Sequence, residues 1–359
     1  AALITTTKSD FEPLVRRIIS ANQRLGGEQQ LNDLLAYVSR NDIPQAMKSE
    51  AIAALGTWSK PSLVDRVDGR YRGEVKRDPT LLREKARPVF LSLLTSNQAD
   101  ARLEAVKAIG KAGVRDASSS LLSLVKSSSD SDMKVAALQA LDRLQTDDLA
   151  EAIPIAMKDS NQAVRVAGLS LLSQSALPLD QKQELLLTII RNQSNEEKRQ
   201  ALLTLSTLEN SASFEGWETI LADFKADRIS SPIWVELEEA IDKTGSETLI
   251  SQFQQLLKEK AGDENWRLFQ GALAEGNVRE GRTIFFQNQA AQCIRCHAYD
   301  DMGGNAGPRL NGIARQLSRE ELLIALVEPS ARLAPGYGFV TLELENGETV
   351  SGTLEKDSA

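Results

Sequence analysis

The stretch Leu103-Glu-Ala-Val-Lys-Ala-Ile109 decides the fold class, because variants of it recur along the chain. Copies begin at Val135, Val166 and Gln200, roughly every 32 residues, and an earlier copy is Ala51-Ile-Ala-Ala-Leu-Gly56. Within these copies the apolar residues fall at i, i+3, i+4 and i+7 spacing, which is typical of amphipathic helices. The sequence therefore predicts a series of related helices, each with one apolar face.

Each later copy follows a polar turn and has a basic residue just inside its helix. These basic residues are Arg102, Lys134, Arg165 and Arg199. Between the copies, second helices are expected over Ser119–Val125, Ala150–Met157 and Gln181–Ile190. A helix pair that recurs at a fixed period indicates an α-solenoid, because each pair buries its apolar face only against its neighbours.

The polar turn, the basic residue and the Ala-rich aliphatic helix together resemble short HEAT-like repeats, over roughly residues 10–260. The period is shorter than that of standard HEAT repeats. The resemblance implies a mainly α-helical protein, with a HEAT-like α-solenoid predicted for residues 1–275.

One insertion, at about residues 58–80, interrupts the period. Its bases are Arg66, Arg70, Arg72, Lys76 and Arg77, and its acids are Asp65, Asp68, Glu74 and Asp78. It could be a docking loop for a partner domain, since insertions in solenoids often map to a binding face. It could equally be a solvated loop whose charges pair with one another.

The two cysteines and the single histidine of the chain lie together in Cys293-Ile-Arg-Cys296-His297. C-x-x-C-H is the attachment signature of c-type haem, since two thiols one turn apart can each add to a vinyl group of the porphyrin. A structural zinc site needs four ligands, whereas the chain offers only these two cysteines and one histidine as soft ligands. A redox C-x-x-C is expected in a βαβ context, and the sequence shows none around the motif. The motif therefore predicts one covalent haem c, bound through Cys293 and Cys296, with His297 as an iron ligand.

Residues on both sides of this motif resemble class I cytochromes c. Gly281 and Phe285 precede it, and Gly307-Pro-Arg-Leu-Asn-Gly-Ile313 follows it. The resemblance implies that the carbonyl of Pro308 accepts a hydrogen bond from Nδ1 of His297, which would fix the tautomer of that ligand.

The same resemblance implies which apolar side chains line the haem. They are Phe285, Leu310, Ile313 and Leu317. The glycine-rich loop 302–307 is expected to let the backbone pass close to the porphyrin.

The C-terminal part predicts a capped helix and then a β-hairpin. Ser318 and Glu321 form a capping box, and Pro329 stops the helix. Its expected apolar face comprises Leu322, Leu323, Leu326 and Val327. Alternation over residues 339–344, followed by Asn346-Gly347, predicts the hairpin.

The run Glu-Pro-Ser-Ala-Arg-Leu-Ala-Pro-Gly-Tyr at 328–337, with this hairpin, resembles the haem-binding domain of planctomycete and verrucomicrobial proteins. In that family a HEAT-like region precedes a c-type haem domain, and the haem region often follows a β-propeller that resembles sugar dehydrogenases. The resemblance covers about residues 278–359 and implies a small cytochrome c-like domain at 276–359.

The sixth iron ligand is not evident. Class I cytochromes c use a downstream Met, but the last Met here is Met302, too soon after His297 to reach the distal face easily. The family resemblance implies that this ligand lies in a tail beyond Ala359. The iron would then be five-coordinate, or bound by water, Tyr337 or Lys356.

Electron transfer through the haem is the expected function, with the solenoid as a docking scaffold for a redox partner protein or a fused dehydrogenase domain. Two alternatives stay open: a haem enzyme or gas or peroxide sensor with an open distal site, where Arg309 or Arg315 could act, and a structural interaction scaffold. The sequence shows no independent catalytic constellation.

Charge and hydropathy limit the partners and the compartment. A net charge of −8 argues against nucleic acid, and no apolar run is long enough to span a membrane. Attachment of haem c takes place outside the cytoplasm, so a periplasmic or other extracytoplasmic location is expected. The chain begins without Met, and we interpret it as a processed piece.

Overall fold

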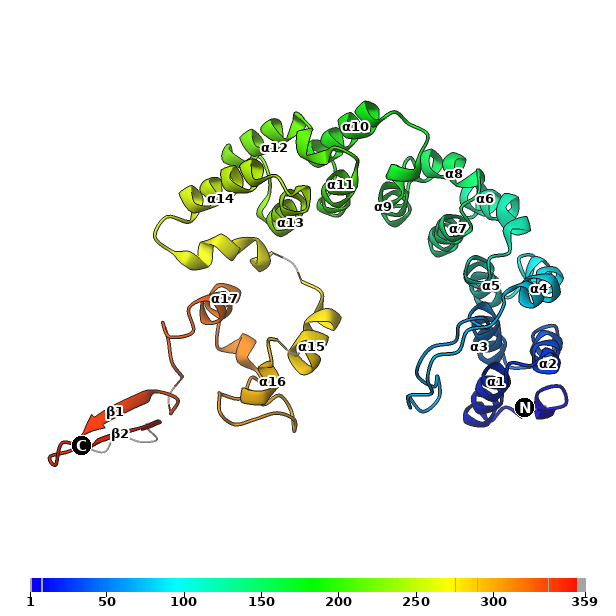
Figure 1. Cartoon of the computed structure of the whole chain (residues 1–359), viewed down its shortest axis with the longest axis horizontal. Helices are drawn as coiled ribbons and strands as arrows, with labels where there is room; N and C mark the ends of the chain where they lie inside the picture. The colour runs from blue at the N-terminus through cyan, green and yellow to red at the C-terminus, as the bar shows by residue number, and fades with distance from the viewer. Residues whose placement is uncertain (1, 8, 275, 289, 335, 354–359) are drawn as a thin grey trace. The chain divides into compact units, whose positions relative to one another are not determined.

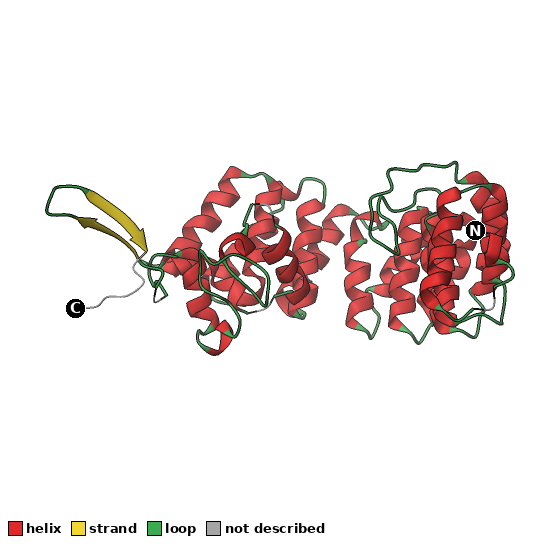
Figure 2. Ribbon diagram, turned by 90° about the horizontal axis from the view of Figure 1, so that it is seen from below, coloured by secondary structure: helices red, strands yellow, loops and turns green. Residues whose placement is uncertain are grey.

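The computed structural model describes residues 2–7, 9–274, 276–288, 290–334 and 336–353 of the chain. The protein is mainly α-helical, with one small two-stranded sheet (Figure 2), as the sequence predicted at this level. It forms two compact units, Ala1–Ile190 and Arg191–Ala359. The boundary predicted between residues 275 and 276 stays a prediction and falls inside the second unit. No helix in the described ranges is long and apolar enough to cross a membrane.

The first unit is a stack of helices. These are η1 (Ala2–Ile4), α1 (Glu12–Leu25), α2 (Glu28–Val38), α3 (Gln45–Gly56), α4 (Thr80–Leu93), α5 (Ala99–Ala112), η2 (Arg115–Ala117), α6 (Ser118–Ser127), α7 (Ser131–Leu144), α8 (Asp148–Ala156), α9 (Gln162–Ser170) and η3 (Leu172–Gln174). Helices α3, α5, α7 and α9 pack against one another in that order, and α2, α4, α6 and α8 pack beside them (Figure 1). The next helix, α10 (Leu179–Asn192), crosses the border between the two units.

Small residues allow the neighbouring helices of this stack to approach closely. A Cβ atom added to Gly56 would lie 2.8 Å from the backbone of Ala108, and one added to Gly110 would lie 2.7 Å from that of Ala140. Apolar side chains of the same helices are almost completely buried in one continuous core. Glycine at these two positions therefore allows the close packing of neighbouring helices.

The insertion is a loop between α3 and α4, with one isolated β-bridge between Val64 and Tyr71. Its buried carboxylate, Asp65, forms ion pairs with Arg17 of α1 and with Arg72 of the loop itself, at 3.1 and 3.4 Å. Burial raises the pKa of Asp65, but two backbone amide hydrogen bonds and these guanidinium groups together lower it below the usual value. The loop charges thus pair both with one another and with the helix beneath.

The second unit begins after Ile190 and ends in the hairpin. Its elements are α11 (Asn195–Thr207), η4 (Ser211–Ser213), α12 (Gly216–Lys225), η5 (Ser231–Ile233), α13 (Trp234–Thr244), α14 (Glu247–Ala261), η6 (Asn265–Leu273), α15 (Val278–Gln287), α16 (Cys293–Cys296), η7 (Ile313–Arg315), α17 (Arg319–Val327), β1 (Phe339–Glu343) and β2 (Thr349–Thr353). The ring of Phe224 packs against Trp234 and Phe253, both at 4.9 Å between centroids, and forms the centre of the packing of α12–α14.

The segment η6 joins these helices to the C-terminal part of the unit. It packs against both α14 and α17, and the Arg319 guanidinium donates to the carbonyl oxygens of Leu273 and Ala274 at 2.9 and 3.2 Å. This segment is a 3₁₀ helix over its whole length.

Helix α17 starts with the predicted capping box. The Ser318 hydroxyl accepts from the Glu321 amide, and the Glu321 carboxylate accepts from the Ser318 amide. The predicted apolar face is wrong for Leu326, whose side chain is 78% exposed, because the helix packs against η6 through its other side.

The predicted hairpin is present, with Phe339 paired to Thr353 and Glu343 to Thr349. Its connection is longer than a two-residue turn, since the Leu344 amide still donates to the Glu348 carbonyl. Gly347 has a φ of 79°, a conformation that favours glycine.

Candidate functional site

The site is built on helix α15 and the turn that follows it. Asn277 caps this helix by accepting hydrogen bonds from the amides of Arg279 and Glu280. Near its end, Phe285 and Phe286 pack edge to face, with centroids 5.0 Å apart. Both rings also lie 6.3–6.4 Å from Tyr299, beyond the C-x-x-C-H motif. Three aromatic rings therefore join the helix to the loop after His297.

The motif itself is a single helical turn, α16. The amide of His297 donates to the carbonyl of Cys293 at 3.0 Å, which places the two cysteines one turn apart. Both are free thiols; Cys293 is half-buried and Cys296 is exposed. Two accessible thiols separated by one turn have the arrangement that a double thioether attachment requires.

The imidazole of His297 is fixed by the backbone at Pro308. Its Nδ1 lies 2.9 Å from the Pro308 carbonyl oxygen, as the sequence predicted. Because a carbonyl can only accept, Nδ1 carries the hydrogen of this bond, and the neutral ring keeps its lone pair on Nε2. The ring is thus oriented by one nitrogen and can bind a metal through the other.

Gly307 packs directly against this imidazole. A Cβ atom added to it would lie 2.7 Å from Cε1 and 2.9 Å from Nδ1 of His297. The glycine is needed for that contact, since a side chain would push the ring away. Sequence reasoning assigned the loop glycines to the approach of backbone to porphyrin and missed this role.

The loop 298–307 folds back onto the C-x-x-C-H turn. The amides of Gly304 and Gly307 donate to the carbonyls of Ile294 and Cys296 at 3.0 and 2.8 Å. A Cβ atom on Gly304 would clash with the Arg295 carbonyl, so a glycine is required here. Met302 precedes these glycines and is held by main-chain hydrogen bonds with Tyr299.

The segment after the loop brings the predicted apolar residues back to the motif. The Leu310 amide donates to the Ala298 carbonyl at 2.9 Å, and Ile313 follows in the short helix η7. Both side chains are half-buried, as is that of Phe285. The Asn311 amide group and the Asp300 side chain add a second link, at 2.8 Å, that the sequence did not suggest.

This part of the second unit has very little core of its own. Among the described residues from 276 to 353, Ala298 is the only one that is buried. Large apolar side chains there are strongly exposed, including Val278, Ile284, Met302 and Leu326. A folded segment normally buries such side chains, and we refer to this exposed apolar set as the cradle.

The other residues considered from the sequence differ in exposure. Arg309 and Arg315 are exposed, and Tyr337 is half-buried. Lys356 lies outside the described residues. Within the described ranges, no three His, Cys, Asp or Glu side chains are grouped as a metal site would require.

Comparison with known proteins gives a distant structural likeness. Neither a family model nor a curated protein matches this sequence. Among solved structures, the chain is similar to one in the complex of CpcE and CpcF of phycocyanin lyase from Nostoc sp. PCC7120. The match has 14% identity and a TM-score of 0.37, and it covers 70% of this chain and 90% of that one.

Proposed function

We propose that this chain carries one c-type haem and transfers electrons through it. The haem would be attached to Cys293 and Cys296, with His297 Nε2 as an axial ligand and Phe285, Leu310 and Ile313 among its apolar contacts. The observation that carries this proposal is the bond between His297 Nδ1 and the Pro308 carbonyl, directly after two free thiols one turn apart. A simple disulfide would not need an oriented imidazole, and a structural zinc site would need a fourth ligand beside the two cysteines and the one histidine of the chain.

The cradle fits a haem by its chemistry. A porphyrin is a large apolar plate, and the uncovered apolar side chains of residues 276–353 would gain contacts from it. When bound, haem iron supplies reversible one-electron chemistry whose potential depends on its ligands and surroundings. The protein's part is to hold the imidazole in place through Pro308 and Gly307, and to exclude water with the rings of α15.

Electron transfer is favoured over substrate chemistry because the residues around His297 include no organised acid or base. Met302 forms main-chain hydrogen bonds with Tyr299, and the Gly304 amide beyond it donates to the Ile294 carbonyl, so the loop holds Met302 close to the C-x-x-C-H turn. The sixth ligand therefore decides between a closed electron-transfer site and the alternative of a ligand-binding enzyme or sensor.

We further propose the architecture that the sequence resemblance implies: a HEAT-like α-solenoid over 1–275 and a class I-like cytochrome c domain over 276–359, as in planctomycete and verrucomicrobial haem proteins. The ordered stacking of α2–α9 supports the first part. The protein would work outside the cytoplasm and would exchange electrons with a redox partner or a fused dehydrogenase domain.

The test is covalent haem retention. The full chain is produced in a host that matures c-type cytochromes, denatured, and extracted with acidified acetone. We expect the haem to stay on the polypeptide, and to be lost when both Cys293 and Cys296 are replaced by Ala. If the double variant keeps its haem, or the wild type releases it, the proposed attachment is wrong.

A second measurement separates the candidate functions. The optical spectrum of the ferrous protein is recorded before and after carbon monoxide is added. A low-spin spectrum that the gas does not change supports electron transfer with a strong sixth ligand. A spectrum that shifts supports the open-site alternative.

A further inference from the structure

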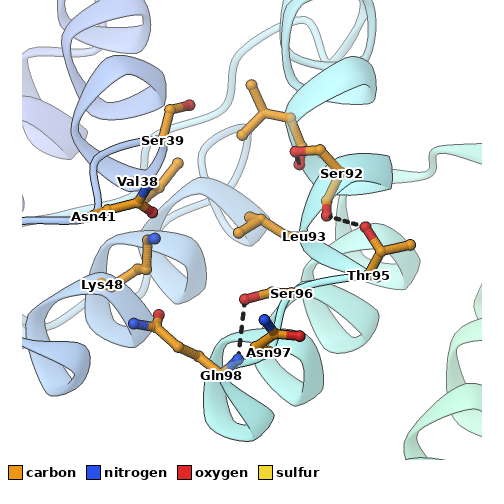
Figure 3. A pocket seen from close by; sticks show the side chains of 11 residues that line it. Val38, Ser39, Asn41, Lys48, Ser92, Leu93, Thr95, Ser96, Asn97 and Gln98 are labelled. Carbon is orange, nitrogen blue, oxygen red and sulfur yellow. Dashed lines mark hydrogen bonds between the residues drawn. The ribbon is translucent and has the colours of Figure 1, made fainter.

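A pocket of about 530 Å³ lies in the first unit, far along the sequence from the haem motif. It opens between the pair α2–α3 on one side and α4, with the turn before α5, on the other (Figure 3). Its walls carry hydroxyl and amide groups, and no carboxylate is among the lining residues. The pocket is thus polar but has no negative charge of its own.

Lys48 of α3 lines this pocket and is the only cation there. The residue is 4% exposed, and its ammonium has no hydrogen-bond or ion-pair partner among the described residues. Burial lowers its pKa, with no neighbouring charge to oppose the effect. The side chain as a whole is buried, and its ammonium lines the pocket, where a group that enters could pair with it.

The repeats show what such a cation does elsewhere. Lys48 precedes the copy Ala51–Gly56 by the same spacing at which Arg102 precedes Ala105, so both occupy one repeat position. In the other copies this cation binds a turn between helices: Arg102 donates to the Ser96 carbonyl at 2.9 Å, and Lys134 pairs with the Asp159 carboxylate at 2.6 Å.

The two remaining copies follow the same rule. Arg165 donates to the Asp159 carbonyl at 2.9 Å, and Arg199 donates to the Pro232 carbonyl at 2.8 Å. Asp159, the partner of Lys134, lies in the turn before the next repeat helix, six residues before Arg165. The equivalent residue for Lys48, six residues before Arg102, is Ser96, which has no carboxylate and lines the same pocket. The cation of this repeat is therefore left for an anion from outside.

A second unsatisfied group lies in the same pocket. The Oε1 atom of Gln98 is buried without a partner, although Gln98 is the residue that precedes α5. It gives α5 no side-chain cap, whereas Asp130 and Asn161 cap α7 and α9 at the equivalent positions. A ligand that binds here needs a hydrogen-bond donor as well as a negative charge.

The hydroxyls of the pocket point to the same chemistry. Those of Ser39, Ser92 and Thr95 donate to helix carbonyls, which leaves their oxygens as acceptors. Ser96 Oγ already accepts from the Gln98 amide, so its own hydrogen is available. The free groups are thus one cation, a few donors and several acceptors.

We propose that this pocket binds a small monocarboxylic acid that also carries a hydroxyl donor. Its carboxylate would pair with Lys48, and its hydroxyl would donate to Gln98 Oε1. One ammonium balances one carboxylate, whereas a phosphate dianion would leave a net negative charge in a buried site. This site is independent of the haem.

The test is a calorimetric titration of the full chain with lactate, with acetate and with inorganic sulfate. We expect saturable binding of lactate that is tighter than that of acetate, which lacks the hydroxyl, and no binding of sulfate. The Lys48→Met variant should bind lactate roughly tenfold or more weakly. Lys111→Met removes an exposed lysine of α5 and should bind lactate as the wild type does.

Three outcomes would overturn the proposal. The first is that neither lactate nor acetate binds at millimolar concentration. The second is that Lys48→Met binds lactate as tightly as the wild type does. The third is that a poly-glutamate peptide binds in a Lys48-dependent way while neither small acid binds. The last result would mean that the pocket takes a carboxylate from a protein partner. Circular dichroism confirms that each variant is folded. The melting temperature of Lys48→Met should be higher than that of the wild type, since the variant lacks an unpaired charge.

Discussion

The stacked helices of the first unit and the segment 276–353 differ in what holds them together. In the first unit, side chains such as Leu141 and Ile109 are completely buried in one continuous core. In the segment, Ala298 alone is buried among the described residues, and main-chain hydrogen bonds give the loop its shape. The first region is stabilised by its own apolar contacts, whereas the second is shaped mainly by main-chain hydrogen bonds.

The difference bears on the proposed haem, because the two regions bury very different shares of their apolar side chains. Stacked helices bury their apolar faces against identical neighbours, so each added pair increases the buried surface. A short loop-rich segment cannot bury enough surface to offset the conformational entropy that it loses on folding. A covalently bound porphyrin would supply both the missing contact area and a fixed anchor.

The largest expected effect comes from removing the attachment. In the double variant Cys293→Ala/Cys296→Ala, amide hydrogens of residues 278–334 should lose nearly all protection from exchange, while those of α5 and α7 keep theirs. Hydrogen exchange followed by mass spectrometry measures both regions at once. Equal protection of the segment in the variant and in the haem-loaded wild type would show that it folds without a prosthetic group.

A matched pair of leucines tests the comparison by stability. Leu141→Ala removes a completely buried side chain and should cost about 2–5 kcal/mol in the free energy of unfolding. Leu326→Ala removes one that is 78% exposed and should change it by less than about 0.5 kcal/mol. Urea denaturation of the haem-free protein gives both values. A large cost for Leu326 in that state would contradict the observed packing of α17.

A matched pair of glycines tests the contact with the imidazole. Gly307→Ala puts a methyl group within 2.9 Å of His297 Nδ1 and should weaken the Pro308 bond at a cost of about 1–3 kcal/mol. The ferric spectrum should then show weaker axial ligation, although the haem stays attached. Gly281→Ala has open space around its Cβ and should leave the spectrum unchanged. An unaltered spectrum for Gly307→Ala would contradict the proposed orientation of the ligand.

The smallest effect concerns the buried ammonium of Lys48, the only titratable residue that lines its pocket. Its folded-state pKa is lowered from the ordinary 10.5, so the unfolded chain binds more protons and stability rises with pH between the lowered pKa and 10.5. Relative to Lys48→Met, the ligand-free wild type should therefore gain stability as the pH rises through that window. Denaturant midpoints at several alkaline pH values measure the difference, and parallel curves would contradict it.

Much of the fold could be read from the sequence, because its signals are local. The copies related to Leu103–Ile109 correspond to α3, α5, α7, α9 and α11, and the second helices fall at α6, α8 and α10. The capping box at Ser318 is present as expected. The exposure of Leu326 was not foreseen, because α17 packs against η6, a segment far away in the sequence.

The candidate site divides in the same way. The residue types and spacing of Cys293, Cys296 and His297 were evident, and the Pro308 contact followed from a resemblance. The sequence did not indicate that Gly307 packs on the imidazole or that Tyr299 packs on Phe285. These close approaches depend on how the loop folds back onto the C-x-x-C-H turn.

The sequence by itself determined the helical periodicity, the hairpin and the chemistry proposed for the C-x-x-C-H motif, since each depends on residues only a few positions apart. The tertiary structure alone decided which charges are paired. Lys48 and Lys134 occupy the same place in the repeat, yet Lys134 meets a carboxylate from the next turn and Lys48 meets a polar pocket. Electrostatic partners are set by distance in space, and only folding brings these turns together.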